Sequence, residues 1–223
     1  MNLARLSPLT AAICLSIYWF WVVVMLIRMR RKTGRMANAV PPEALGRLMR
    51  VGWYPCIFLL IAALWVTAFK RPELVSFDAA HLHKMNGLWI WFAWFWLPNT
   101  AWWIALIPVS LAGGAATVMT FVCWRRMGRS WRIGIDPGEK LALVSTGPYR
   151  YVRHPIYALR MVINVCAFIM APTPLVLLTA GLDFLLLQIE ARREERYMQS
   201  KHGSAYEEYR DSVGRFLPRA FVG

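Results

Sequence analysis

Long runs of apolar residues, separated by short basic segments, limit the folds open to this chain. The runs cover residues 9–27, 51–69, 101–124 and 156–189, and the last is interrupted at residues 171–174. A helix needs about 20 apolar residues to cross the hydrocarbon of a bilayer. Hydrophobic residues make up 58% of the 223 positions, whereas soluble domains contain about 45–50%. We therefore predict an all-α polytopic membrane protein with about five transmembrane helices.

The charge of the chain is strongly positive and lies mainly between the apolar runs. Lysine and arginine total 26 against 12 aspartate and glutamate residues, a formal net charge of +14. Seven bases and a single acid, Glu43, fall in residues 28–50, and seven bases and two acids fall in residues 125–153. Positive loops stay on the cytoplasmic side and attract anionic lipid head groups. We predict that both segments are cytoplasmic, and we expect no nucleic acid partner.

The segment 88–97 is rich in aromatic residues but is too short to cross a bilayer as a helix. A further crossing there would also place the basic segment 125–153 outside. We therefore predict an interfacial aromatic anchor. His81 and His83 are too few ligands for a metal site, so we expect none. The four cysteines lie inside apolar runs without metal-ligand spacing, which predicts buried free thiols.

The last apolar run predicts a helical hairpin. Ala171-Pro172-Thr173-Pro174 divides it into halves of about 16–17 residues, and the prolines indicate a turn. A hairpin brings its two cytoplasmic ends side by side. His154 and Pro155 lie at one end, and residues 190–195 lie at the other. Residues about 40 positions apart are therefore expected to form one polar corner at the membrane surface.

Polar helical extensions are predicted beyond two of the apolar runs. The helix of residues 101–124 is expected to continue from Arg125 to Trp131, until Gly134 breaks it. Half of the acidic residues of the chain lie after the last run. These residues predict a cytoplasmic C-terminal helical segment that reaches about Ser212.

The polar corner carries groups that are suited to ligand binding. Arg153 presents a fork of donors for a carboxylate or phosphate. His154 and Tyr157 are three positions apart and share a helix face. Glu194 and Glu195 point about 100° apart on a helix, so they cannot both face one ligand squarely. One is expected to bind a cationic or hydroxyl-rich ligand, while the other pairs with Arg153 or Arg192.

Two opposite charges lie inside the predicted hairpin. Arg160 and Asp183 are 12 and about 11 residues from the turn, so they are expected to face each other at equal depth. An unpaired charge there would be costly, which favours a buried ion pair. The alternative is that Arg160 binds the polar head group of a substrate.

The polar corner belongs to a larger set of four sequence blocks. These are Trp124-x-x-Met127-Gly128-x-x-Trp131, then Gly147 to Tyr157, then Arg193-Glu194-Glu195, and finally Gly203-x-x-Tyr206-x-x-Tyr209 with Arg215-x-x-Pro218. They cover about residues 117–219 and resemble the isoprenylcysteine carboxyl methyltransferase and phospholipid methyltransferase type of integral membrane methyltransferases. The resemblance implies an enzyme that uses S-adenosylmethionine.

The resemblance also implies roles for individual residues. Arg153, Glu194 and Glu195 would be catalytic, and Arg153 would orient the methyl acceptor. The cofactor would be surrounded by Tyr149, His154, Pro155, Tyr157 and one of Glu194 or Glu195. Residues 101–223 would form the catalytic membrane core. Residues 1–100 match no motif of the family and would form the N-terminal spans.

Several alternatives stay open from the sequence. The family usually has glycine two positions after the motif tyrosine, where this chain has Leu159. The acceptor could be a lipid-tailed prenylcysteine-like carboxylate, the amine of a phospholipid, or a small thiol. An NADPH enzyme of the sterol reductase type and a non-catalytic membrane scaffold are the other classes. We expect a bacterial inner membrane with the site facing the cytoplasm; an endoplasmic reticulum location and the oligomeric state are left open.

Overall fold

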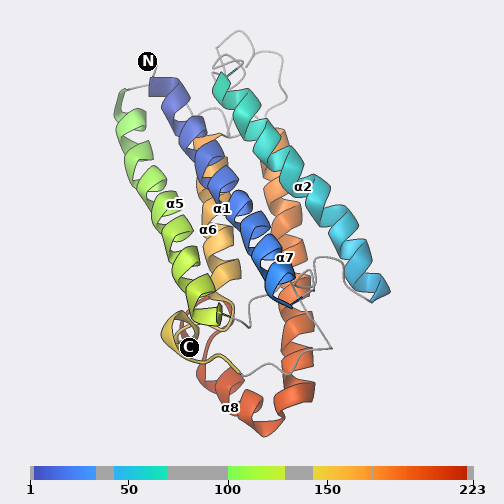
Figure 1. The fold of residues 1–223 in the computed structure, drawn as a ribbon. Coiled ribbons are helices and arrows are strands. Elements are labelled where there is room, and N and C mark those ends of the chain that lie inside the picture. The colour runs from blue at the N-terminus through green and yellow to red at the C-terminus, as the bar shows by residue number, and fades with distance from the viewer. Residues whose placement is uncertain (1–2, 34–42, 70–99, 129–142, 172, 220–223) are drawn as a thin grey trace, which may run out of the picture.

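The fold is a bundle of helices of membrane-spanning length. The computed structural model describes residues 3–33, 43–69, 100–128, 143–171 and 173–219. The principal helices of these ranges lie side by side (Figure 1). They are α1 (Leu3–Thr33), α2 (Ala44–Phe69), α5 (Thr100–Met127), α6 (Pro155–Met170) and α7 (Pro174–His202), with a 3-10 turn, η3 (Gly147–Arg150), before α6 and a short helix, α8 (Ser204–Ser212), after α7.

The lengths of the helices confirm an all-α membrane protein. Four of them, α1, α2, α5 and α7, are long and apolar enough to cross a bilayer. The fifth, α6, is apolar but has only 16 residues. Within the described ranges the backbone forms no strand, and the parallel contact of Val152 with Gly214 is an isolated bridge.

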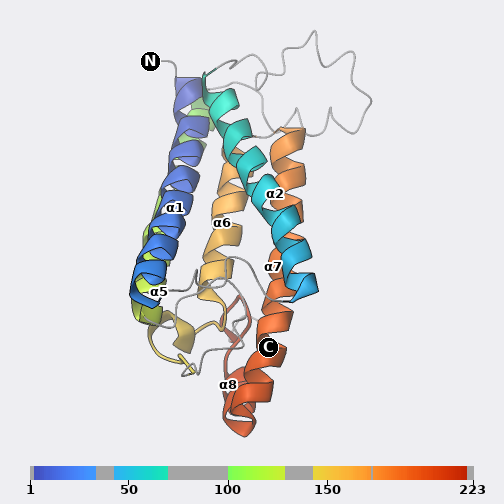
Figure 2. The same ribbon diagram turned by 45° about the vertical axis from the view of Figure 1, so that its right-hand side comes forward.

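The predicted hairpin is confirmed at its turn. α6 ends at Met170, and α7 begins at Pro174, which occupies the first helical turn. The Thr173 hydroxyl accepts a 3.2 Å hydrogen bond from the Val176 amide and so caps the start of α7. Proline has no amide hydrogen to leave unpaired there. The two helices therefore run antiparallel, which brings the start of α6 beside the polar half of α7 (Figure 2).

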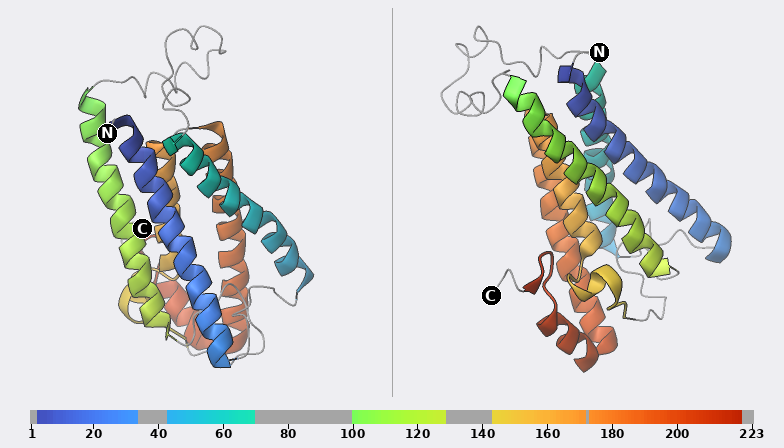
Figure 3. Two further views of the ribbon diagram at one scale, coloured as in Figure 1. Left: turned by 45° about the horizontal axis from the view of Figure 1, so that its top comes forward. Right: turned by 90° about the vertical axis from the view of Figure 1, so that its left-hand side faces the viewer.

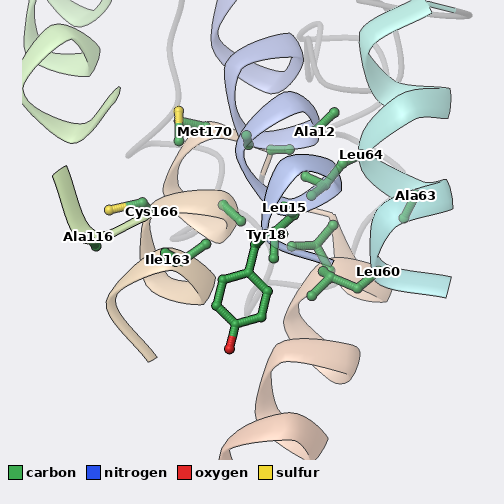
Figure 4. Close-up of a cluster of buried hydrophobic side chains, with 14 of the residues drawn as sticks. Ala12, Leu15, Tyr18, Leu60, Ala63, Leu64, Ala116, Ile163, Cys166 and Met170 are labelled. Carbon is green, nitrogen blue, oxygen red and sulfur yellow. The ribbon is translucent and has the colours of Figure 1, made fainter. Parts of the chain in front are cut away.

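The core of the bundle is made by buried side chains of α1, α2, α5 and α6, together with Val176 of α7. α1 packs against α2, α5 and α6, while α7 packs against α2 and α6. Figure 4 shows a part of this core, contributed by Ala12, Leu15 and Tyr18 of α1, Leu60, Ala63 and Leu64 of α2, Ala116 of α5, and Ile163, Cys166 and Met170 of α6. In lipid, close packing rather than expulsion of water holds such helices together.

Two small residues of α5, Gly113 and Ala116, contribute to this packing. Gly113 is buried, and a Cβ at this position would lie 3.4 Å from Cys166 Cβ of α6. Glycine thus lets α5 and α6 approach closely. Ala116 is also buried in the same core.

One helix end and one helix interruption differ from the sequence prediction. α5 was expected to continue to Trp131, but it ends at Met127, where Gly128 takes a φ of 53° that L side chains rarely adopt. The polar segment after the last run is helical as far as Ser212, as predicted, but it is divided into two helices. Gly203, with a φ of 54°, ends α7 and starts α8 in a new direction (Figure 3). The aromatic segment 88–97, His81, His83 and Trp131 lie outside the described residues.

Candidate active site

The polar corner predicted from the sequence is formed where the start of α6 meets the polar half of α7. His154 is the N-cap residue of α6, and Pro155 is buried in its first turn. The C-terminal tail, residues 213–219, lies across this start. Arg153 donates its amide hydrogen to the Gly214 carbonyl at 2.8 Å, and His154 donates to the Arg215 carbonyl at 3.0 Å. Main-chain hydrogen bonds therefore join segments about 60 residues apart.

Glu195 is held between two arginines. Arg153 Nε lies 3.1 Å from Glu195 Oε1, while Arg215 contacts both carboxylate oxygens at 2.9 and 2.5 Å. Nη1 of Arg153 donates hydrogen bonds to the main-chain carbonyls of Arg210 and Val213. These contacts confirm the expected pairing of one glutamate with Arg153. They also show that Arg153 binds the C-terminal tail with the same guanidinium.

Glu194 faces the other side of the corner. Its Oε1 accepts a 2.6 Å hydrogen bond from the Tyr157 hydroxyl, and its Oε2 lies 3.4 Å from His154 Nδ1. The other ring nitrogen of His154 lies 3.3 Å from Glu195 Oε1. The imidazole therefore touches both glutamates, one at each edge, although two adjacent glutamates were not expected to face one group squarely.

The surroundings of His154 favour its protonated form. Burial by itself lowers the pKa of His154, but hydrogen bonds and charges from Glu194 and Glu195 outweigh burial and leave the pKa raised above its ordinary value. The ring stacks on Tyr157, with centroids 5.4 Å apart and planes at 2°. The imidazole ring bridges two carboxylates and fixes the start of α6 on α7.

Tyr149 adds a buried hydroxyl to the corner. Its side chain is 7% exposed, and its hydroxyl has no hydrogen-bond partner among the described residues. Its main-chain carbonyl accepts a 2.6 Å hydrogen bond from the Tyr209 hydroxyl, which places η3 against α8. Burial, followed by the neighbouring Cys123 and Glu194, raises the pKa of Tyr149. A buried hydroxyl of this kind fits a site that takes a polar ligand.

A second charged cluster lies on the neighbouring face of α7, towards α2. Glu190 Oε2 lies 2.5 Å from Arg193 Nη1, and Glu190 Oε1 lies 3.4 Å from Arg50 Nη2. Arg193 Nη2 also lies 2.5 Å from Glu43 Oε2, at the start of α2. Sequence reasoning gave these residues no role. The position of Glu190 one helical turn before Glu194 was the available signal.

The predicted pair of Arg160 and Asp183 is confirmed, but it lies deeper in the bundle. Arg160 Nη2 is 2.5 Å from Asp183 Oδ1, and both side chains are almost fully buried. Asp183 also accepts hydrogen bonds from Trp53 Nε1 and Asn164 Nδ2 at 2.5 and 2.6 Å. The Arg160 guanidinium lies over the rings of Trp19 and Trp53, 4.6 and 4.8 Å from their centroids. This arrangement joins α1, α2, α6 and α7 and supports the structural interpretation.

Two further residues noted in the sequence have clear positions. Leu159 packs against the core shared by α1, α2, α5 and α6. Arg215, which the sequence placed in the tail block without a role, completes the clamp on Glu195. The spacing Arg215-x-x-Pro218 was its only signal in the sequence.

Comparisons with known proteins show sequence similarity to one family. A sequence model of the isoprenylcysteine carboxyl methyltransferase (ICMT) family matches residues 104–200. The chain is also similar to the Protein-S-isoprenylcysteine O-methyltransferase of Dictyostelium discoideum, with 24% identity over 180 residues that cover 73% of each chain. The family match includes α6, most of α7 and the segment between α5 and α6.

Proposed function

We propose that this chain, an integral membrane methyltransferase that belongs to the isoprenylcysteine carboxyl methyltransferase family, methylates the carboxylate of a lipid-tailed acceptor with S-adenosylmethionine. The observation that carries the proposal is the corner formed by Glu194, Tyr157, His154 and Tyr149 at the end of apolar, membrane-length helices. The similarity to the Dictyostelium Protein-S-isoprenylcysteine O-methyltransferase supports an S-isoprenylcysteine as the acceptor class.

The residues of the corner fit the cofactor. S-adenosylmethionine carries a sulfonium, an amino group, a carboxylate and ribose hydroxyls, and when bound it supplies a methyl group to the acceptor oxygen and leaves S-adenosylhomocysteine. Glu194 is a carboxylate whose side chain is 23% exposed, so it can accept from an amino or hydroxyl group. The ring of Tyr157 offers a face to a cation. The Tyr149 hydroxyl can donate to a carboxylate or accept from a hydroxyl.

The chain acts on the reaction mainly by positioning. An acceptor carboxylate is already ionised at neutral pH, so neither Glu194 nor His154 has to remove a proton. Alignment of the two reactants, together with exclusion of water, can then supply much of the rate. We assign Arg153 and Glu195 to this positioning, because Arg153 holds Glu195 and the tail against the start of α6. Arg160 stabilises the helical bundle through its buried ion pair with Asp183.

We place the corner at the cytoplasmic face of the membrane, in a bacterial inner membrane. The ends of α1 and α5 and the starts of α2 and α6 meet at this end of the bundle (Figure 1). Arginines gather there, among them Arg28, Arg30, Arg31, Arg47, Arg125, Arg126 and Arg150. The positive-inside bias supports this orientation, and the same residues would contact anionic lipid head groups.

A methyl transfer assay tests the proposal. The purified protein in lipid vesicles would receive methyl-labelled S-adenosylmethionine with N-acetyl-S-farnesylcysteine, phosphatidylethanolamine or a small alkyl thiol. We expect label in the farnesylcysteine product, and base should release it as methanol because only an ester is cleaved. Glu194→Gln should weaken cofactor binding in calorimetry, while Glu208→Gln, an exposed change on α8, should not.

Other outcomes of this assay select other functions. Base-stable label on phosphatidylethanolamine or on the thiol would replace the carboxylate acceptor. Binding of NADPH without binding of S-adenosylmethionine would favour a reductase. Binding of neither would favour a scaffold, and each of these results would contradict the proposal.

A further inference from the structure

The cluster of Glu43, Arg50, Glu190 and Arg193 has no part in the proposed cofactor site, although it lies directly beside it. Arg193 and Glu194 are neighbours on α7, and Glu190 lies one turn earlier. Tyr157, which contacts Glu194, also packs against the small core of Trp53, Ile57 and Leu187 between α2 and α7. The cluster and the polar corner are thus linked through neighbouring residues of α7 and through Tyr157.

The cluster contains one buried and one partly buried cation around a buried anion. Arg50 and Glu190 are 4% and 1% exposed, and the side chain of Arg193 is 10% exposed. Glu190 uses one oxygen for each arginine. A single carboxylate between two guanidiniums leaves an excess of positive charge, so the site favours a further anion and disfavours a cation.

Glu43 supplies that further anion in the structure. Its carboxylate lies 2.5 Å from Arg193 Nη2, and its side chain is 45% exposed, unlike the other members of the cluster. An exposed carboxylate gains little from a single ion pair because water competes for both partners. Glu43 is therefore the member of the cluster that another carboxylate can replace most easily. It is also the single acid in the basic segment 28–50.

We propose that Glu43 occupies the position of the acceptor carboxylate on Arg193, and that the acceptor binds between α2 and α7 by displacing it. Arg193 would then bind the carboxylate beside the cofactor corner, and Glu43 would set the affinity for it. This inference rests on the proposed methyltransferase function and narrows the acceptor to an anionic head group. The amine of a phospholipid would meet the excess positive charge of Arg50 and Arg193 and would be excluded.

Steady-state kinetics with N-acetyl-S-farnesylcysteine test the inference. If Glu43 covers Arg193 in most molecules, Glu43→Gln removes a competitor and should lower the KM for the acceptor about threefold to tenfold. The kcat and the affinity for S-adenosylmethionine should stay unchanged. Glu208→Gln removes an exposed carboxylate at the same end of the molecule and should leave the acceptor KM unchanged.

A double-mutant cycle separates competition from a structural role. Arg193→Gln should raise the acceptor KM by about tenfold or more, since it removes the charge that binds the carboxylate. In that background, Glu43→Gln should no longer lower the KM. Glu43→Asp keeps the charge on a shorter side chain and should lie between the original protein and Glu43→Gln.

The opposite results would overturn the inference. A KM that is unchanged or raised in Glu43→Gln, with an unchanged melting temperature, would show that Glu43 only fixes the start of α2. An effect of Glu43→Gln that persists without Arg193 would show that the two residues do not share the acceptor. Failure of the proposed function is distinguishable, because it would appear as no farnesylcysteine ester with the unaltered protein.

Discussion

Tyr157 and Glu194 are 37 positions apart in the sequence, and their side chains form a 2.6 Å hydrogen bond between α6 and α7. The bond fixes the orientation of the Glu194 carboxylate at the polar corner. The other oxygen lies 3.4 Å from the ring of His154, which stacks on Tyr157. Glu194 is thus oriented by two neighbouring side chains before any ligand arrives, and such preorganisation lowers the cost of binding.

Tyr157→Phe should weaken the binding of S-adenosylmethionine without loss of the fold. The change removes the hydroxyl that orients Glu194 but keeps the ring on His154. A hydrogen bond to a charged group contributes about 1.5 kcal/mol or more, so the dissociation constant should rise about tenfold. Calorimetry on the detergent-solubilised protein measures it. Tyr151→Phe, at a position 63% exposed, is the matched control, and equal affinities for the two variants would refute the role given to Tyr157.

Asp183→Asn should destabilise the bundle. The change removes the negative charge that faces Arg160 in the interior. Removal of one partner of a buried pair costs about 3–5 kcal/mol. Thermal unfolding in detergent should show a clear loss, while the folded fraction should still bind S-adenosylmethionine. Asp211→Asn, which alters an exposed ion pair with Arg210, should have little effect. Normal stability with loss of acceptor binding would instead assign Arg160 to the substrate.

Gly113→Leu should loosen the contact of α5 with α6. A Cβ at residue 113 already touches Cys166 and Met170 at 3.4–3.8 Å, so the additional atoms of a leucine are expected to overpack this contact. Overpacking of this kind costs about 1–3 kcal/mol, which unfolding in detergent can measure. Gly114→Leu is the control, since a Cβ there meets nothing within 4 Å. Similar losses in both variants would point to helix propensity or lipid contacts rather than to the α5–α6 contact.

The stability of the protein should depend on pH through His154. Its pKa is raised in the folded state, so the protonated ring contributes stability fully below the unfolded pKa, about 6.5. That contribution is lost as the pH rises through the higher pKa of the folded state. The melting temperature of the unaltered protein should therefore exceed that of His154→Gln by more at pH 6 than at pH 8. A difference that does not change with pH would contradict a charged bridge between Glu194 and Glu195.

The sequence alone was sufficient to predict the hairpin and the ion pair buried inside it. Pro172 and Pro174 cannot continue a helix, so the turn follows from local chemistry. An isolated charge inside a bilayer is costly, so Arg160 and Asp183 had to meet once the turn was placed. The sequence also brought His154 and residues 190–195 to one end, because residues at similar distances from the turn lie at the same level of an antiparallel hairpin.

Only the tertiary structure decided which charged side chains pair at that end of the hairpin. The rotation of α7 about its axis turns Glu195 towards Arg153 and Arg215, and Glu194 towards Tyr157. That rotation is set by packing against α2 and α6, which no local sequence pattern encodes. The path of the tail over the start of α6 also depends on long-range main-chain hydrogen bonds. Likewise, the contact of Glu43 with Arg193 joins two helices whose distance in space is fixed by the whole bundle.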